Sequence, residues 1–195
     1  MSQADLQDEM DLPLEGVRVL DLSRVLAGPL CGQVLADFGA EVIKVEHPGR
    51  GDDTRDWGMR VGKTETTYFN SVNRSKRSIT LDLQTPEAVQ IIYDLLPQFD
   101  VVISNFKHGG ADKMGLGYDK LKSLKPDLIY CTVAGSTTVL APPYRLDGQR
   151  LPVRSAPPML GEGTREVLQQ LLAMSDEQLQ QLQQRGVLTM PEAAA

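Results

Sequence analysis

Two segments rich in polar and charged side chains directly follow short apolar runs, and each could bind a ligand. Residues 23–29 come after the apolar run 17–22, and residues 46–55 come after the run 42–45. Short apolar runs with β-branched residues are typical of buried parallel strands. In sheets of such strands, ligands bind beside the carboxyl ends. Residues 23–29 and 46–55 are therefore the first candidates for a binding site.

The loop 23–29 limits which nucleotide chemistry is open to this site. Glu46 sits where a ribose-binding acid of a dinucleotide fold would be expected. However, the loop has a single glycine, Gly28, and lacks the G-x-G-x-x-G pattern that lets the backbone approach a pyrophosphate. The phosphate loop G-x-x-x-x-G-K-[ST] is also missing from the sequence. A nicotinamide or ATP site, and with it an NAD(P)-dependent reductase, is therefore disfavoured.

Basic residues outnumber acidic ones between residues 50 and 77. Seven Lys/Arg stand there against four Asp/Glu, a local charge of +3, whereas the whole chain carries −6. A solvated loop is the first interpretation, and a docking surface for a small phosphorylated ligand is the second. The acidic balance of the chain argues against nucleic acid as its main partner.

Helix and strand patterns alternate through residue 133. A helix is expected to begin at Gly28-Pro29, since proline suits the first helical turn, and to stop at Gly39. Its apolar stripe is expected to lie on the sheet: Leu30, Val34, Leu35 and Phe38. Further strands are expected at 78–83, 101–104 and 128–133, and further helices at 66–72, 85–96 and 118–124. This alternation predicts an α/β fold, a Rossmann-like doubly wound, mainly parallel sheet with helices on both faces, to which two C-terminal helices are added.

The chain divides into four parts by composition. Residues 1–12 are expected to be a disordered leader, 13–135 the Rossmann-like large domain, 136–158 a proline-rich connection, and 159–190 two helices that pack on the large domain. Thr164 is expected to cap the first of these helices. Ser175 with Gln178 predicts a capping box for the second, and Gly186 its end.

Composition excludes several classes of protein. The chain has 195 residues, of which 41% are hydrophobic and 24% charged, as in ordinary globular proteins. Cys31 and Cys131 are too few for a disulfide framework or a metal site, so core thiols are expected and no metal. No apolar run is long enough to span a membrane, and the acidic start lacks a signal pattern. A cytoplasmic location is therefore expected, without membrane contact.

Six motifs in register resemble one family. They are LEGVRVLDLSRVLAGP (14–29), LADFGAEVIKVEHPGRGDDTR (35–55), NRSKRSITLDL (73–83), VVISNF (101–106), MGLGYDKL (114–121) and IYCTVAG (129–135). This set resembles the family III CoA-transferases, the CaiB/BaiF family, which include formyl-CoA and carnitine CoA-transferases. Residues 154–188 resemble the C-terminus of the same family. The resemblance implies an acyl-CoA:carboxylate CoA-transferase that uses coenzyme A or an acyl-CoA as substrate, without a nicotinamide cofactor.

The resemblance also implies a set of residues that hold CoA at the strand-end loops. His47 stands where the family often has Arg, and Lys113 stands where an Arg commonly pairs with a phosphate; lysine keeps the charge but not the bidentate geometry. The residues carried over from the family are Val25, Leu26, His47, Leu81, Asp82, Gln84, Asn105, Phe106, Lys107 and Lys113.

The aspartate that performs the family's chemistry has no counterpart in this sequence. In the family its carboxylate attacks the acyl thioester and then carries CoA as an aspartyl thioester. It follows a glycine-rich turn and a P-G-[FY]-D motif, and neither stands after Gly135. The later Asp147 and Asp176 are expected to be structural.

The chain therefore resembles a large domain whose central portion is missing, with no catalytic residue. We expect it to bind CoA without turnover, and any homodimer to lack the interlocked rings of the family. The alternative is a ligand-free Rossmann-like folding module or scaffold.

Overall fold

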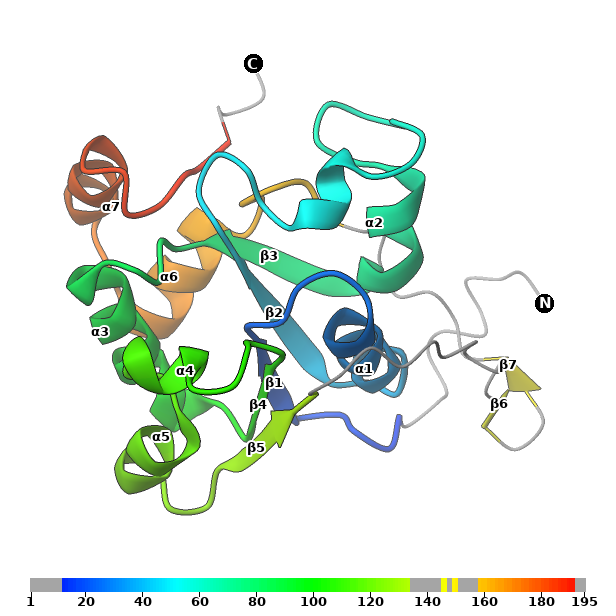
Figure 1. The fold of residues 1–195 in the computed structure, drawn as a ribbon, viewed down its shortest axis with the longest axis horizontal. Coiled ribbons are helices and arrows are strands. Elements are labelled where there is room, and N and C mark those ends of the chain that lie inside the picture. Colours follow the sequence, from blue (N-terminus) through cyan, green and yellow to red (C-terminus); the bar gives the residue numbers. More distant parts are fainter. Residues whose placement is uncertain (1–11, 134–144, 147–148, 151–157, 192–195) are drawn as a thin grey trace.

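Five parallel strands form the central sheet of the protein. The computed structural model describes residues 12–133, 145–146, 149–150 and 158–191. The strands are β1 (Arg18–Asp21), β2 (Glu41–Glu46), β3 (Lys76–Thr80), β4 (Val101–Ser104) and β5 (Ile129–Thr132), in the order β3-β2-β1-β4-β5. The chain runs outward from β1 to β3, then returns to place β4 on the other side of β1 (Figure 1). The predicted α/β, doubly wound fold is confirmed, and its switch point lies between β1 and β4.

Helices cover both faces of this sheet. The larger core lies between one face and the helices α3 (Pro86–Leu95), α5 (Tyr118–Leu124), α6 (Thr164–Leu172) and α7 (Asp176–Gln184). The other face carries α1 (Ala27–Asp37), against which α2 (Thr67–Asn73) packs. Shorter elements complete the described chain: η1 (Asp53–Asp56), η2 (Leu96–Gln98), α4 (Gly110–Lys113) and the antiparallel pair β6 (Arg145–Leu146) and β7 (Gln149–Arg150).

The packing of α1 differs from the prediction. Leu35 contacts the smaller core, but Leu30, Val34 and Phe38 are half-exposed, and the buried side of the helix holds Gly28, Pro29, Gly32, Gln33 and Ala36. The reason is visible at Gly32, where an added Cβ would lie 2.9 Å from Asp21 Oδ2 and 3.3 Å from Lys76 Nζ. Small residues face the sheet because buried charged side chains, not a hydrophobic layer, lie beneath this part of the helix.

Capping explains where several helices begin and end. The Thr85 side chain accepts a hydrogen bond from the Ala88 amide, and Ser175 with Gln178 forms the predicted capping box. Gly39, after α1, has φ +110°, a conformation that favours glycine. The prediction for Thr164 was wrong: it is the first residue of α6, and its Oγ1 accepts the Thr80 amide hydrogen instead.

The C-terminal segment 158–190 lies along the free edge of β3. The Gly163 amide donates to Ser78 O at 2.8 Å, and Asp82 N donates to Val187 O at 2.8 Å. The Thr80 hydroxyl donates to Thr189 O and accepts from the Thr189 amide. Six apolar side chains of this segment are buried in the larger core: Val167, Leu168, Leu179, Val187, Leu188 and Met190. The segment is therefore part of the sheet's packing and covers an edge that would otherwise be open.

Cys31 and Cys131 are half-buried free thiols that pack against the smaller core, and burial, with Cys131 nearby, raises the pKa of Cys31.

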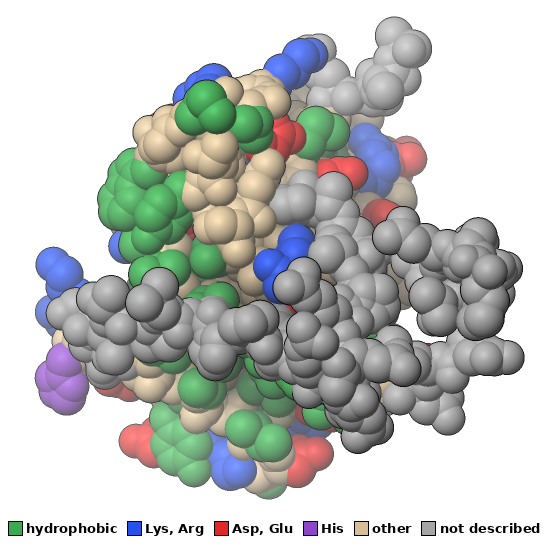
Figure 2. Space-filling view, turned by 90° about the vertical axis from the view of Figure 1, so that its right-hand side faces the viewer, with side chains coloured by type: hydrophobic (Ala, Val, Ile, Leu, Met, Phe, Trp, Pro, Cys, Tyr) green, Lys and Arg blue, Asp and Glu red, His purple; other side chains and the backbone are tan. Residues whose placement is uncertain are grey.

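Figure 2 shows charged side chains of both signs dispersed over one face, with no continuous basic stripe on its described part. Within the described residues, no helix has the length and apolarity needed to cross a membrane.

Candidate functional site

The candidate site is the carboxyl edge of the sheet around the switch point. Val25 and Leu26 follow β1, His47 follows β2, Leu81, Asp82 and Gln84 follow β3, and Asn105, Phe106 and Lys107 follow β4. These nine predicted residues thus stand after four neighbouring strands. Lys113 stands apart at the end of α4, where its side chain is exposed. Topology therefore brings the predicted loops to one edge of the sheet.

Asn105 joins the loops that follow β1 and β4. Its Oδ1 accepts a hydrogen bond from Arg24 N at 2.8 Å, and its Nδ2 donates to Arg24 O at 2.6 Å. Across the switch point, the Asn105 side-chain amide thus makes the pair of hydrogen bonds that the backbone of a neighbouring strand would make. It fixes the position of the residue immediately before Val25.

The remaining predicted residues divide by exposure. Leu81 is buried, and its amide donates to Glu46 O at 2.9 Å, whereas the Asp82 carboxylate accepts the Gln84 amide hydrogen at 3.1 Å. His47 is half-buried, with Nδ1 2.5 Å from Pro48 O. The side chains of Gln84 and Lys107 are exposed. Several backbone groups and the exposed side chain of Lys107 therefore lie at this edge.

A cavity of about 180 Å³ opens beyond β4 and β5. Phe106, Lys107 and His108 line one side of it, and Tyr118 and Tyr130 line another. The two tyrosine rings meet edge to face, with centroids 6.0 Å apart. The cavity thus combines aromatic surface with the ammonium of Lys107 and the carboxylate of Asp112.

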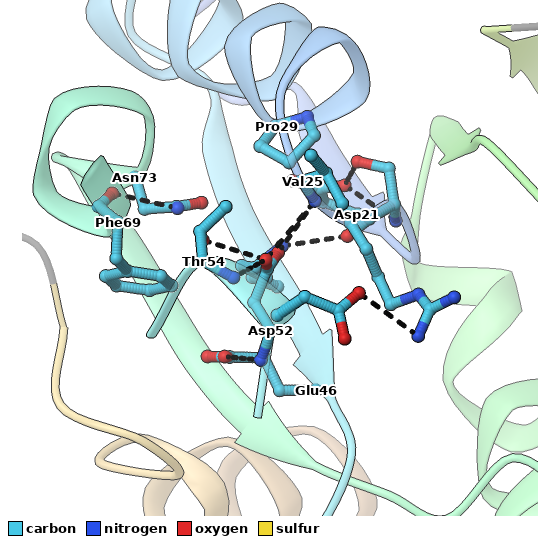
Figure 3. A network of polar contacts seen from close by, with 12 residues as sticks. Asp21, Val25, Pro29, Glu46, Asp52, Thr54, Phe69 and Asn73 are labelled. Atoms are coloured by element: carbon cyan, nitrogen blue, oxygen red, sulfur yellow. Dashed lines mark hydrogen bonds and ion pairs between the residues drawn. The ribbon is translucent and has the colours of Figure 1, made fainter. Parts of the chain in front are cut away.

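A network of charged groups lies buried beneath these loops, on the α1 side of the sheet (Figure 3). Lys44 Nζ lies 2.9 Å from Asp52 Oδ2 and donates to Ser23 O at 2.8 Å. Lys76 Nζ donates to Asp21 Oδ2 at 2.9 Å and to Pro29 O at 2.7 Å. The lysine heads therefore tie the strands to the loop after β1 and to the start of α1.

The protonation of this network follows from burial and pairing. Burial acts to raise the pKa of Asp21, but Lys76 and Lys44 outweigh it and hold that pKa below its usual value. Burial acts to lower the pKa of Lys44, but Asp21 and Asp52 outweigh it and raise that pKa. Burial prevails at Lys76 and lowers its pKa to about 8. The lysines thus differ in how firmly they keep their protons.

A second buried pair joins Glu46 to Arg55. Arg55 Nε and Nη2 donate to the two carboxylate oxygens of Glu46, each at 2.7 Å, and Ser78 Oγ donates to the same carboxylate. The guanidinium also lies 3.6 Å from the centroid of the Phe69 ring. Because both Glu46 oxygens already accept hydrogen bonds in the interior, Glu46 is not placed to bind a ribose, which argues further against a dinucleotide.

The basic stretch 50–77 holds most of its cations in ion pairs, which leaves few of them for the docking surface considered from the sequence. Arg55 and Lys76 are buried in the network, and Arg60 pairs with Asp56 at 3.2 Å. Two more cations of the stretch are likewise held by carboxylates: Arg74 by Asp37, and Arg77 by Glu41 and Glu166. Arg50 and Lys63 keep exposed side chains. Most of the local positive charge therefore serves the fold.

Sequence reasoning missed the network, although the strands carry a signal of it. Lys44 and Glu46 alternate with Ile43 and Val45, so the second half of β2 has one charged face and one apolar face. Among the described residues, no group of three His, Cys, Asp or Glu side chains could hold a metal ion. Of the later aspartates, Asp176 contacts Arg165 and Gln169 on α6, and Asp147 lies outside the described residues.

Comparisons with known proteins find relatives that share the part of the chain that forms this edge. The sequence profile of CoA-transferase family III matches residues 14–137. Succinyl-CoA:glutarate CoA-transferase of Mus musculus is 52% identical over 123 residues, which cover 63% of this chain and 28% of the relative. A solved CAIB/BAIF family protein from Brucella suis is 50% identical, with a TM-score of 0.59, over 63% of this chain and 33% of that one.

One comparison extends further along the chain. A solved mutant protein of Mycobacterium tuberculosis is 35% identical with a TM-score of 0.58, and the match covers 90% of this chain and 51% of that one. By contrast, the chain spans 28% to 33% of the length of the curated relatives named above and of an acyl-CoA transferase from Fusarium pseudograminearum. The matched residues 14–137 contain all the strand-end loops of the candidate site.

Proposed function

Because the chain belongs to CoA-transferase family III, we propose that the carboxyl edge of its sheet binds coenzyme A or an acyl-CoA. The observation that supports this most is that the family match and the topology of the sheet point to the same edge. The family match spans residues 14–137, and within it the structure gathers four strand-end loops at the switch point, where ligands of this fold class bind. The relatives that match are named for transfers of CoA between acids.

The proposed contacts follow the polarity of the ligand. The backbone of Val25 and Leu26 meets the adenosine end, and Leu81, Asp82 and Gln84 add contacts from the loop after β3. His47, Lys107 and Lys113 face the phosphates. Asn105 and Phe106 shape the floor beside the cavity of about 180 Å³. Exposure of Lys107 and Lys113 leaves both ammonium groups free to meet an anion.

We further propose that the chain binds CoA without catalysing its transfer. A nucleophilic carboxylate must reach the thioester, but the buried carboxylates at this edge are all engaged: Asp21 with Lys76, Asp52 with Lys44, and Glu46 with Arg55. None of them is free among the described residues. The absence of the family's P-G-[FY]-D motif from the sequence supports the same proposal.

The test is a calorimetric titration with CoA, dephospho-CoA and NADPH. NADPH is the matched control ligand, because it carries adenosine and phosphates but no pantetheine arm. We expect weak binding of CoA, weaker binding of dephospho-CoA, and no measurable heat with NADPH. No binding at millimolar CoA would favour the scaffold alternative, and preference for NADPH would revive a nicotinamide enzyme.

Mass spectrometry after incubation with an acyl-CoA tests the absence of turnover. A covalent aspartyl-CoA thioester would refute it, whereas an unmodified mass together with CoA binding supports it. The doubly substituted Lys107→Ala, Lys113→Ala protein serves as the binding control. Its affinity should fall, and the salt dependence of binding should weaken with it.

A homodimer and a cytoplasmic location complete the proposal. The exposed side chains of Leu124 and Ile129, near the open edge strand β5, support association of two copies. Light scattering of the purified protein over a range of concentrations measures the oligomeric state. A monomer at every concentration would exclude the homodimer.

A further inference from the structure

Val25 adopts a backbone conformation that its side chain disfavours. Its φ is +73°, in the left-handed region, where a β-branched residue is a genuine outlier. Among the described residues other than glycine, Ser75 and Ala173 share a positive φ, and neither is β-branched. Such strain persists where surrounding groups over-determine the conformation, and it gathers at ligand-binding loops.

The group that holds this conformation is the carboxylate of Asp52. Both of its oxygens lie 3.2 Å from Val25 N, which donates to them (Figure 3). Thr54 donates to Oδ1 from its amide at 3.0 Å and from its hydroxyl at 2.8 Å. The Lys44 ammonium lies 2.9 Å from Oδ2. A single buried side chain from the loop after β2 thus fixes the loop after β1.

The same loop is pinned a second time at the adjoining residue. Arg24 exchanges two backbone hydrogen bonds with the Asn105 side chain from the loop after β4. Lys44 also donates to Ser23 O at 2.8 Å. Three consecutive residues are therefore held by groups from the two neighbouring strands or the loops after them, and Leu26 follows as the N-cap residue, directly before α1.

We propose that Asp52 is a positioning residue, whose carboxylate, paired with Lys44, holds Val25 in the left-handed conformation and so presents the backbone of Val25 and Leu26 to the ligand. This inference rests on the proposed function for the identity of that ligand. Its structural half, the control of Val25 by Asp52, belongs to the free protein.

The charge of Asp52 suits this role. Burial acts to raise its pKa, but the Lys44 ammonium and the two hydrogen bonds from Thr54 outweigh burial and hold that pKa below its usual value. The side chain is therefore an acceptor on both oxygens at neutral pH. Asparagine in its place has one acceptor oxygen and an NH₂ group that must face either the Lys44 ammonium or the two Thr54 donors, and in both orientations it also faces the Val25 amide, which donates to both oxygens.

Hydrogen exchange of the ligand-free protein measures the structural half. In Asp52→Asn, the Val25 amide should exchange at least about tenfold faster, while amides of β4 keep their protection. Asp56→Asn is the matched control, since Asp56 lies in the short helix η1 that Asp52 caps but pairs with Arg60 at the surface. It should leave the exchange of Val25 unchanged. Unaltered exchange at Val25 in folded Asp52→Asn would overturn the proposal.

Titration with CoA measures the functional half through a double-mutant cycle. If about a tenth of the loops keep the native conformation, CoA should bind Asp52→Asn about tenfold more weakly. Glycine adopts positive φ without strain, so Val25→Gly should restore most of this loss in the double variant. An equal loss in both backgrounds would show that Asp52 acts elsewhere and would refute positioning through Val25.

The proposal can still be tested if Asp52→Asn does not fold or if the unaltered protein does not bind CoA. Should Asp52→Asn fail to fold, Thr54→Val removes one hydrogen bond that orients the carboxylate, and Val25 exchange should accelerate by a smaller factor in the same direction. No acceleration there would overturn the proposal. Should the unaltered protein fail to bind CoA, the proposed function falls, while the exchange of Val25 still decides whether Asp52 controls this loop.

Discussion

Replacing Arg55 by methionine should destabilise the protein more than any surface change. Arg55 is 3% exposed and makes two hydrogen bonds of 2.7 Å to the buried Glu46 carboxylate. It also donates to Thr64 O at 3.0 Å and Pro158 O at 3.2 Å, so it links β2 to the C-terminal segment. Methionine fills similar space beside Phe69 but leaves Glu46 as an uncompensated charge. Breaking a buried pair in this way costs about 3–5 kcal/mol.

The second variant of this test separates the orphaned charge from the lost packing. Glu46→Gln in the Arg55→Met background removes the charge, so the double variant should lose only about 1–3 kcal/mol, from backbone carbonyls left without donors. Urea unfolding followed by circular dichroism measures both free energies of unfolding. With a slope of about 1–3 kcal/mol per molar urea, the single variant should unfold at least about 1 M earlier. A loss below about 1 kcal/mol for Arg55→Met, or a double variant no more stable than the single one, would refute the reasoning.

Three further predictions concern other buried groups. Lys76 has a pKa lowered to about 8 in the folded protein, so the unfolded chain binds more protons between pH 8 and 10, and folding stability from this group rises with pH. The free energy of unfolding of the native chain, minus that of Lys76→Met, should therefore rise by up to about 1.4 kcal/mol per pH unit. The raised pKa of Cys31 acts oppositely in both proteins, and most of its effect cancels because burial and Cys131 raise that pKa more than Lys76 lowers it. A flat difference across this range, in urea titrations at each pH, would contradict it. Thr80→Val leaves the Thr189 amide without its acceptor and should cost about 1–3 kcal/mol, with faster proteolysis of the C-terminal segment; unchanged proteolysis would show that the segment is held otherwise. Ser175→Ala removes the capping box of α7 and should lower the thermal stability by about 1 kcal/mol, measured by calorimetry, unless the helix is held by its tertiary contacts alone.

Most of the architecture could be predicted because each element carries its own local signal. Buried parallel strands read as apolar runs, and Thr85-Pro86 and Ser175 mark helix starts that need no tertiary information. Their alternation then leaves few topologies open, since parallel strands require crossovers. The predicted strand at 78–83 was placed too late because β3 begins with Lys76, a residue that edge and loop segments usually carry. Thr164 misled for a related reason, since its hydroxyl serves β3 rather than its own helix.

The charged layer beneath the loops could not be predicted from composition, because a lysine in the interior of a strand reads as a solvent-facing residue. Lys44 between Ile43 and Val45 fits an ordinary half-exposed strand equally well. What reverses that interpretation is a set of partners distant in sequence: Asp52 from the next loop and Ser23 from the loop after β1. A charge is stable in the interior only when such partners converge on it, so each buried lysine of this layer must have carboxylates within reach. The loop that presents Val25 is therefore shaped by residues that never need to touch the ligand, and it is the fold beneath the site, rather than the loop sequence, that sets the loop's conformation.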